Sequence, residues 1–190
     1  EVIQGSPTTL VSASNNKEAA EFIQKLFYSK TVRTYVNSDV KGVELGGSIK
    51  NVIAIASGIL DGVGYGDNTK AALLTRGLYE ISKLGVAMGG NLKTFSGLSG
   101  MGDLIVTCYS KYSRNRYVGE KLGRGKELKN ILGGMSMIAE GIHTTESAHK
   151  LAKNYSIDMP ITQAVYDVLF NGKEPKTAVQ DLMTRDLIEE

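Results

Sequence analysis

The chain has 190 residues, of which 42% are apolar and 22% are charged, and its formal net charge at pH 7 is +2. This composition is typical of a folded globular chain and excludes a disordered or fibrous protein. The charge is too small for a general attraction to nucleic acid or to an acidic membrane surface, so any anion-binding site has to be local.

The first forty residues are predicted to form a strand, a helix and a second strand. β-Branched runs over 8–13 and 31–36 favour strands, and Asn15 or Asn16 can cap a helix that extends to Phe27. A βαβ unit cannot bury both faces of its sheet, so we expect this segment to be the edge of a larger α/β sheet. The chain begins at Glu1 without Met or a signal-peptide pattern, and we therefore expect it to be a piece of a longer protein.

From about Gly42 onward the sequence predicts helices and almost no strand. A long apolar helix is expected over 44–60, a glycine-rich loop over 61–67 and an amphipathic helix over 68–88. Shorter helices are predicted over 103–109, 113–122, 126–132, 144–154, 161–170 and 176–182. The chain holds 22 glycines against 3 prolines, and we expect most glycines at helix ends and in turns.

The longest apolar run, 52–60, is about half of the ~20 residues that cross a bilayer, so no membrane span is expected. The helix that contains it carries Lys50 and Asn51 in its middle. Burial disfavours the charged form of an ammonium, so a lysine placed there could give or take a proton near neutral pH. The alternative is a lysine whose stem packs against the protein while its head reaches water.

A second cluster of glycines surrounds an aspartate, in the stretch from Gly97 to Leu104. The glycines permit a tight backbone path that brings Asp103 to the beginning of a helix. Its carboxylate could pair there with a buried lysine. The alternative is a plain helix N-cap, because aspartate is among the residues most favoured at that position.

A third cluster combines Ser113, Arg114 and Asn115. Ser113 can begin a helix whose free backbone N–H groups attract an anion, Arg114 offers a planar fork of donors, and Asn115 adds a neutral donor. This pattern indicates a phosphate or carboxylate site; the alternative is a solvated, capped helix start with surface arginines. Tyrosines interleave with basic residues over 109–117 and could stack on nucleic-acid bases, but the small net charge argues against a nucleic-acid partner.

Several other chemistries lack their sequence patterns. No segment matches the complete G-x-G-x-x-G dinucleotide fingerprint, the P-loop, the G-x-S-x-G elbow or H-E-x-x-H. His143 and His149 do not have the spacing of metal ligands on one helix face, so no metal site is expected. The single cysteine, Cys108, excludes an intrachain disulfide, is typical of a reducing compartment and is interpreted as a packed side chain.

Taken together and in this order, the three clusters resemble the bacterial-type NAD(P)-dependent glycerol-3-phosphate dehydrogenases. The resemblance runs from about Glu1 to Arg185 and covers only the carboxyl-terminal part of such an enzyme. The matching stretches are 44–54, 62–68, 97–103, 107–108 with 113–115, 138–141 and 159–162. The resemblance implies a mainly α fold, with a helical substrate domain of the 6-phosphogluconate dehydrogenase C-terminal-like type over 42–190. Residues 1–41 would be the βαβ end of a Rossmann-type nucleotide-binding domain.

The resemblance also implies an activity and its residues. A hydride would pass between the nicotinamide ring and C2 of glycerol 3-phosphate or dihydroxyacetone phosphate, a reaction that supplies glycerophospholipid synthesis. Lys50 would be catalytic, with Asp103 and Asn51 orienting Lys50 or the substrate hydroxyls. The implied substrate-binding residues are Lys50, Asp103, Ser113, Arg114 and Asn115.

Cofactor contacts with NAD or NADP are implied at Arg114, at Ile138, where the common family pattern has Val, and at Glu140. The family's nucleotide fingerprint precedes Glu1, so this piece alone is expected to be inactive. We further expect a cytoplasmic protein, and broad apolar helices favour a homodimer.

Two alternatives remain open from the sequence. The chain could belong to another dehydrogenase with a helical second domain, such as the ketopantoate or 3-hydroxyisobutyrate enzymes, although the Ser113–Asn115 cluster speaks against this. It could also be a helical dimerisation or ligand-binding module without catalysis.

Overall fold

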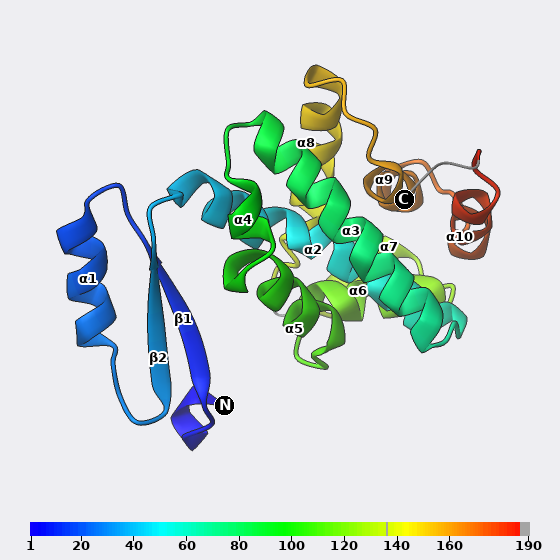
Figure 1. Ribbon diagram of the computed structural model, residues 1–190. Coiled ribbons are helices and arrows are strands. Elements are labelled where there is room, and N and C mark those ends of the chain that lie inside the picture. The colour runs from blue at the N-terminus through cyan, green and yellow to red at the C-terminus, as the bar shows by residue number, and fades with distance from the viewer. Residues whose placement is uncertain (136, 187–190) are drawn as a thin grey trace.

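The computed structural model describes residues 1–135 and 137–186, and it confirms a mainly helical chain with a small sheet at its amino-terminal end (Figure 1). Strands β1 (Thr8–Ala13) and β2 (Val32–Asn37) pair in parallel, with Thr8 opposite Val32, and α1 (Lys17–Leu26) connects them. A short 3-10 turn, η1 (Val2–Gln4), precedes β1. The predicted strand–helix–strand unit is confirmed.

This βαβ unit leaves large apolar side chains in solvent. Phe22 and Leu26 on α1 are 64% and 62% exposed, and Phe27 just after the helix is 51% exposed. Leu10 of β1 and Val36 of β2 are also exposed. As expected, one helix and two strands do not cover both faces of the sheet.

The helical part is built around one central helix, α2 (Val40–Val63), which the other helices surround (Figure 1). Its residues from Val52 to Leu60 are all buried. The helices that contact it most are α3 (Asp67–Ala87), α5 (Asp103–Tyr109), α6 (Arg114–Gly123) and α8 (Gly141–Asn154). The remaining elements are α4 (Leu92–Phe95), η2 (Leu98–Gly102), α7 (Leu128–Gly133), α9 (Pro160–Phe170) and α10 (Pro175–Met183).

By length and composition alone, α2 could cross a bilayer, although the core helices of soluble proteins meet the same criterion. In this fold 61% of its most apolar window is buried inside the molecule. Its apolar face is therefore largely accounted for by contacts with the neighbouring helices.

The structure differs from the predicted elements in several details, the first being that α2 begins at Val40 rather than at residue 44. The loop expected over 61–67 is confined to Gly64–Gly66, because α2 continues to Val63, and Gly64 ends the helix in the left-handed conformation at φ 95°. The tight turn expected before Asp103 is a π-helical turn, η2, that continues directly into α5. Helix α4 was not predicted.

The glycines also differ from expectation, since many lie inside helices at helix–helix contacts rather than at helix ends. Gly58 on α2 and Gly119 on α6 face the partner backbone where these two helices cross. A Cβ atom added to Gly119 would overlap the carbonyl oxygen of Ile55 and lie 2.9 Å from the amide nitrogen of Ile59. Gly62 and Gly123 repeat this contact one turn further on. Glycine thus permits α2 and α6 to pack backbone against backbone.

A buried carboxylate joins α3 to the start of α9. Glu80 is 2% exposed and accepts hydrogen bonds from the backbone N–H of Ile161 at 2.6 Å and of Thr162 at 3.1 Å. The Thr162 hydroxyl also donates to it at 2.9 Å. These two N–H groups belong to the first turn of α9, which has no intrahelical partners for them. Burial raises the pKa of Glu80 to about 7, although the hydrogen bonds lower it.

The contribution of Glu80 to stability should therefore depend on pH. The folded-state pKa of about 7 lies above the ordinary value of 4.5, so this contribution is fully present below pH 4.5 and is lost as the pH rises through 7. Relative to Glu80→Gln, the free energy of unfolding of the unmodified protein should fall by about 3 kcal/mol over that range, at about 1.4 kcal/mol per pH unit. Urea unfolding of both proteins between pH 4 and 8 measures this difference.

Glu174→Gln is the matched control. Glu174 also caps a helix, accepting from the N–H of Thr177 at 2.7 Å, but it is exposed and its pKa is lowered by that hydrogen bond. Its difference curve should have the opposite slope. A flat curve for Glu80→Gln would show that the buried carboxylate does not change protonation in this range.

Candidate functional site

Lys50 of α2 forms an ion pair with Asp103, the first residue of α5. The distance from Lys50 Nζ to Asp103 Oδ2 is 2.5 Å, and the two side chains are 18% and 34% exposed. This confirms the predicted pairing of Asp103 with a lysine of the apolar helix. The carboxylate replaces hydration that the ammonium loses by partial burial, while the remaining exposure leaves both groups within reach of a ligand.

The path that delivers Asp103 depends on close backbone contacts. A Cβ atom on Gly46 of α2 would lie 2.6 Å from the carbonyl oxygen of Ser99 in η2, one helical turn before the Lys50–Asp103 contact. Gly100 packs still more closely on the backbone of Phe95, whose carbonyl oxygen an added Cβ atom would overlap. One turn beyond Asp103, the hydroxyl of Thr107 donates to the Asp103 carbonyl oxygen at 2.6 Å. Gly46 on α2 and Gly100 in η2 therefore allow the segment before Asp103 to pack close to α2, at the level of Lys50.

Asn51, the neighbour of Lys50, joins α2 to α6 and α8. Nδ2 of Asn115 donates to Oδ1 of Asn51 at 2.9 Å, and the backbone N–H of Gly141 donates to Oδ1 of Asn115 at 3.0 Å. Asn115 is 9% exposed. The amide of Asn115 therefore fixes three helices relative to each other.

Ser113 and Arg114 form the beginning of α6. Ser113 is the N-cap, and its hydroxyl accepts from the backbone N–H of Arg116 at 3.3 Å, which confirms the predicted helix start. Arg114 is exposed, and one of its guanidinium nitrogens donates to the carbonyl oxygen of Ile138 at 3.0 Å. Ile138 is 68% exposed, and Glu140 lies directly before α8.

These contacts bring the two halves of the predicted site together. Lys50 and Asn51 are consecutive, as are Arg114 and Asn115, so the Asn51–Asn115 hydrogen bond places the lysine–aspartate pair beside the start of α6. The ammonium and the carboxylate thus pair where α5 begins against α2, the guanidinium of Arg114 belongs to the neighbouring start of α6, and all three groups are at least partly exposed. Such a set can hold an anionic group and exchange a proton with a neighbouring oxygen.

Sequence reasoning missed Arg116 and Asp61, which are linked by a short ion pair near this site. Asp61 fell in a predicted loop, and Arg116 was given no role beyond that of a surface arginine in the alternative interpretation of this cluster. One signal was available for Arg116, because it precedes Glu120 by four residues on the same helix, a spacing at which side chains of opposite charge meet.

Other residues singled out from the sequence are structural. Cys108 is fully buried, and burial raises the pKa of its thiol to about 12, as expected for a packed side chain. His149 is buried and stacks on Tyr166 with ring centroids 4.0 Å apart, whereas His143 is exposed. Over residues 1–135 and 137–186, the structure places no three His, Cys, Asp or Glu side chains where they could hold a metal ion.

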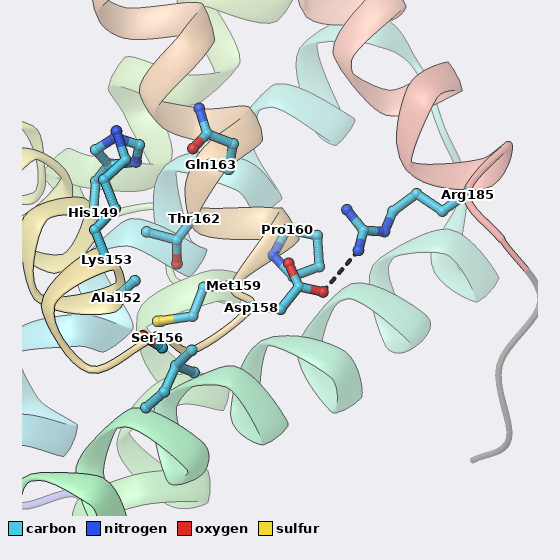
Figure 2. A pocket seen from close by; sticks show the side chains of 11 residues that line it. His149, Ala152, Lys153, Ser156, Asp158, Met159, Pro160, Thr162, Gln163 and Arg185 are labelled. Carbon is cyan, nitrogen blue, oxygen red and sulfur yellow. Dashed lines mark hydrogen bonds and ion pairs between the residues drawn. The ribbon is translucent and has the colours of Figure 1, made fainter.

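Two hollows on the molecule are lined by other residues, although the second includes the segment just before Asp103. One of about 320 Å³ lies where α8 leads into α9, and the Asp158–Arg185 ion pair, with a 2.7 Å contact, borders it (Figure 2). The other, of about 420 Å³, lies between the ends of β1 and β2 and the α4–η2 segment. Neither is lined by Lys50, Asp103 or Arg114. We therefore define the site by its charged groups rather than by a cavity.

A family model and two similar proteins indicate the same family for this chain. The model of the family "NAD-dependent glycerol-3-phosphate dehydrogenase C-terminus" matches residues 39–180. A protein of Pelodictyon phaeoclathratiforme named glycerol-3-phosphate dehydrogenase (NAD(P)+) is 53% identical over the whole chain and 57% of its own length. One of Salinibacter ruber with the same name is 56% identical over 97% of the chain and 54% of its own length.

A solved structure supports the same family. The crystal structure of glycerol-3-phosphate dehydrogenase from Coxiella burnetii superposes with a TM-score of 0.93 at 41% identity, over 97% of this chain and 57% of that one. The chain thus spans about half the length of the curated relatives that it matches. On the family match over residues 39–180 and these identities, the chain belongs to the glycerol-3-phosphate dehydrogenase family and contains its carboxyl-terminal domain.

Proposed function

We propose that this chain is the substrate-binding and catalytic part of an NAD(P)-dependent sn-glycerol-3-phosphate dehydrogenase, which interconverts glycerol 3-phosphate and dihydroxyacetone phosphate. The observation that carries the proposal is the Lys50–Asp103 pair, linked through Asn51 and Asn115 to the exposed Arg114. The proposal is that this proton-exchanging pair and this anion-binding group act on one bound substrate. A short phosphorylated polyol needs both.

In the mechanism, the nicotinamide cofactor supplies or accepts the hydride at C2 when it is bound. Lys50 exchanges the accompanying proton with the C2 oxygen: its ammonium gives the proton during ketone reduction, and its neutral amine takes it during alcohol oxidation. Asp103 holds Nζ of Lys50 at 2.5 Å and so orients it. Thr107 holds the backbone of Asp103.

The phosphate of the substrate would lie at the start of α6. The amino-terminal end of a helix attracts anions, and Ser113 keeps this end well formed by capping it. The guanidinium of Arg114 presents paired donors that match phosphate oxygens. We also propose Asn115 as a substrate contact; its hydrogen bonds with Asn51 and Gly141 connect the start of α6 to α2 and α8.

The cofactor contacts that we propose are Arg114, Ile138 and Glu140. Their exposure supports this assignment, because an exposed guanidinium contacts the backbone of an exposed apolar residue at one edge of the site. This edge fits a ligand that is partly apolar and partly anionic, as a nicotinamide nucleotide is. NAD and NADP both have this character.

We further propose a domain boundary near residue 41, with 1–41 as the end of a nucleotide-binding domain and 42–190 as the helical domain. The family match from residue 39 and the exposed apolar side chains of the βαβ unit support this boundary. Residues 136 and 187–190 of the proposed helical domain lie outside the described residues. We also propose that the protein is cytoplasmic, which its single buried cysteine supports, and homodimeric, which its exposed apolar side chains support.

The test is a steady-state assay of the full-length protein that contains this chain. It should oxidise glycerol 3-phosphate with NAD+ or NADP+ and should not oxidise glycerol. Arg114→Ala should raise KM for glycerol 3-phosphate about 10- to 100-fold, since a charge-assisted hydrogen bond contributes about 1.5–3 kcal/mol. Turnover of non-phosphorylated hydroxy acids alone would overturn the proposal and favour another dehydrogenase. An absence of turnover with any of these substrates would favour a non-catalytic module.

A further inference from the structure

We infer that Arg116 is a positioning residue for the substrate phosphate. It fixes the turn over 110–113 that sets the start of α6 against the Lys50–Asp103 pair. This inference rests on the proposed function and adds to it a residue that holds the phosphate-binding segment in place. The argument comes from the contacts of one guanidinium group.

The Arg116 side chain is 15% exposed and engages three separate parts of the fold. Its Nε donates to the carbonyl oxygen of Ser110 at 3.2 Å, one terminal nitrogen lies 2.6 Å from Oδ2 of Asp61, and the other lies 3.1 Å from Oε2 of Glu120. These acceptors belong to the turn after α5, to α2 and to α6 itself. One planar group therefore joins the three elements that form the site.

The partners of Arg116 are themselves held. Nζ of Lys70 on α3 lies 2.6 Å from Oδ1 of Asp61, so the carboxylate of Asp61 is shared between two cations. Nζ of Lys70 also lies 4.8 Å from the ring centroid of Tyr109, the last residue of α5. The network thus contacts the end of α5 at two points, which are the ring of Tyr109 and the carbonyl oxygen of Ser110.

The connection that Arg116 anchors is short and joins the two halves of the site. Ser110 is the C-cap of α5, the helix that begins with Asp103, and Ser113 is the N-cap of α6, the helix that begins with Arg114. A hydrogen bond from the N–H of Ser113 to the carbonyl of Ser110, at 3.1 Å, closes the turn. A shift of this turn would move Arg114 relative to Asp103. Catalytic geometry is sensitive to such displacements.

Only an arginine can make this set of contacts. Its planar fork directs donors to three acceptors at fixed angles, whereas a lysine is a flexible point charge. A lysine at position 116 could keep the pairing with Asp61 but would release the carbonyl of Ser110. Because all three guanidinium nitrogens of Arg116 contact protein acceptors and the side chain is largely buried, its effect on substrate passes through the turn.

The experiment compares Arg116→Lys with Arg124→Lys in the full-length protein. Arg124 pairs with the same Glu120, at 2.5 Å, but its side chain is 55% exposed, so it is a matched control. Arg116→Lys should raise KM for glycerol 3-phosphate about 10-fold, a loss of about 1.4 kcal/mol, and leave kcat within about 3-fold. Inorganic phosphate should inhibit this variant less strongly by a similar factor. Arg124→Lys should match the unmodified protein.

Asp61→Asn provides a second variant, because it keeps the shape of the side chain and weakens its hold on Arg116. It should raise KM for glycerol 3-phosphate in the same selective way. Unchanged KM for glycerol 3-phosphate in both variants, or a fall in kcat as large as the rise in that KM, would overturn the inference and indicate a purely structural network. Failure of the unmodified protein to oxidise glycerol 3-phosphate would instead contradict the proposed function, so the two failures are distinguishable.

Discussion

Replacing Lys50 with Ala in the complete enzyme is expected to lower kcat for glycerol 3-phosphate oxidation about 10²- to 10⁴-fold, the usual contribution of a general acid or base. KM for the cofactor should change little, because Lys50 pairs with Asp103 and lies on a different helix from the proposed cofactor residues. Steady-state kinetics with each substrate varied in turn separates the two parameters. The loss should appear in both directions of the reaction, since the same group gives and takes the proton.

Two companion variants separate proton transfer from charge. Lys50→Arg keeps a cation beside Asp103, but a guanidinium does not lose its proton in proteins, so its kcat should be almost as low as that of Lys50→Ala. Lys41→Ala removes an exposed lysine from the first turn of the same helix and should be indistinguishable from the unmodified protein. Near-normal kcat in Lys50→Arg would mean that Lys50 acts only as a charge. Near-normal kcat in Lys50→Ala would remove it from the chemistry altogether.

The sequence was sufficient for most of the local structure. Asn16, Ser113 and the Pro residues before 161 and 176 mark helix starts, and each lies within a residue or two of the observed boundary. The pairing of Lys50 with Asp103 could be predicted as one of two possibilities, because a counter-charge stabilises a lysine in an apolar helix, but a lysine that reaches water and a plain N-cap aspartate were the alternatives. These features follow from capping and periodicity, which are local in the sequence.

The tertiary use of glycine could not be predicted from the same information. A glycine at a helix end and a glycine at a helix crossing look alike in one sequence, and the expectation of turns over 61–67 was wrong for that reason. Gly62 is helical and packs against α6. Arg116 was missed for a related reason, since two of its three acceptors, Asp61 and the Ser110 carbonyl, lie outside its own helix. Only the fold shows which helices approach each other.

Gly119→Ala should be among the most destabilising single-methyl substitutions in this chain. Its Cβ atom would overlap the backbone of Ile55, and a backbone atom cannot move aside as a side chain can, so α6 would have to shift away from α2. Overpacking typically costs about 1–3 kcal/mol, and a contact with backbone should fall at the upper end of that range. At about 2–4 °C for each kcal/mol in a chain of this size, Tm should fall by about 6–12 °C.

Gly47→Ala is the control, because it adds the same methyl group to α2 at a position with no atom within 4 Å of the new Cβ. It should raise stability by up to about 1 kcal/mol through helix propensity. The comparison also tests the site, since α2 carries Asn51 and α6 carries Asn115, whose 2.9 Å hydrogen bond spans the same crossing. Separation of the helices should weaken that bond and raise KM for glycerol 3-phosphate in Gly119→Ala. Equal Tm values for the two variants would show that α2 and α6 tolerate a wider crossing, and the glycines would then have no role in placing Lys50 beside Arg114.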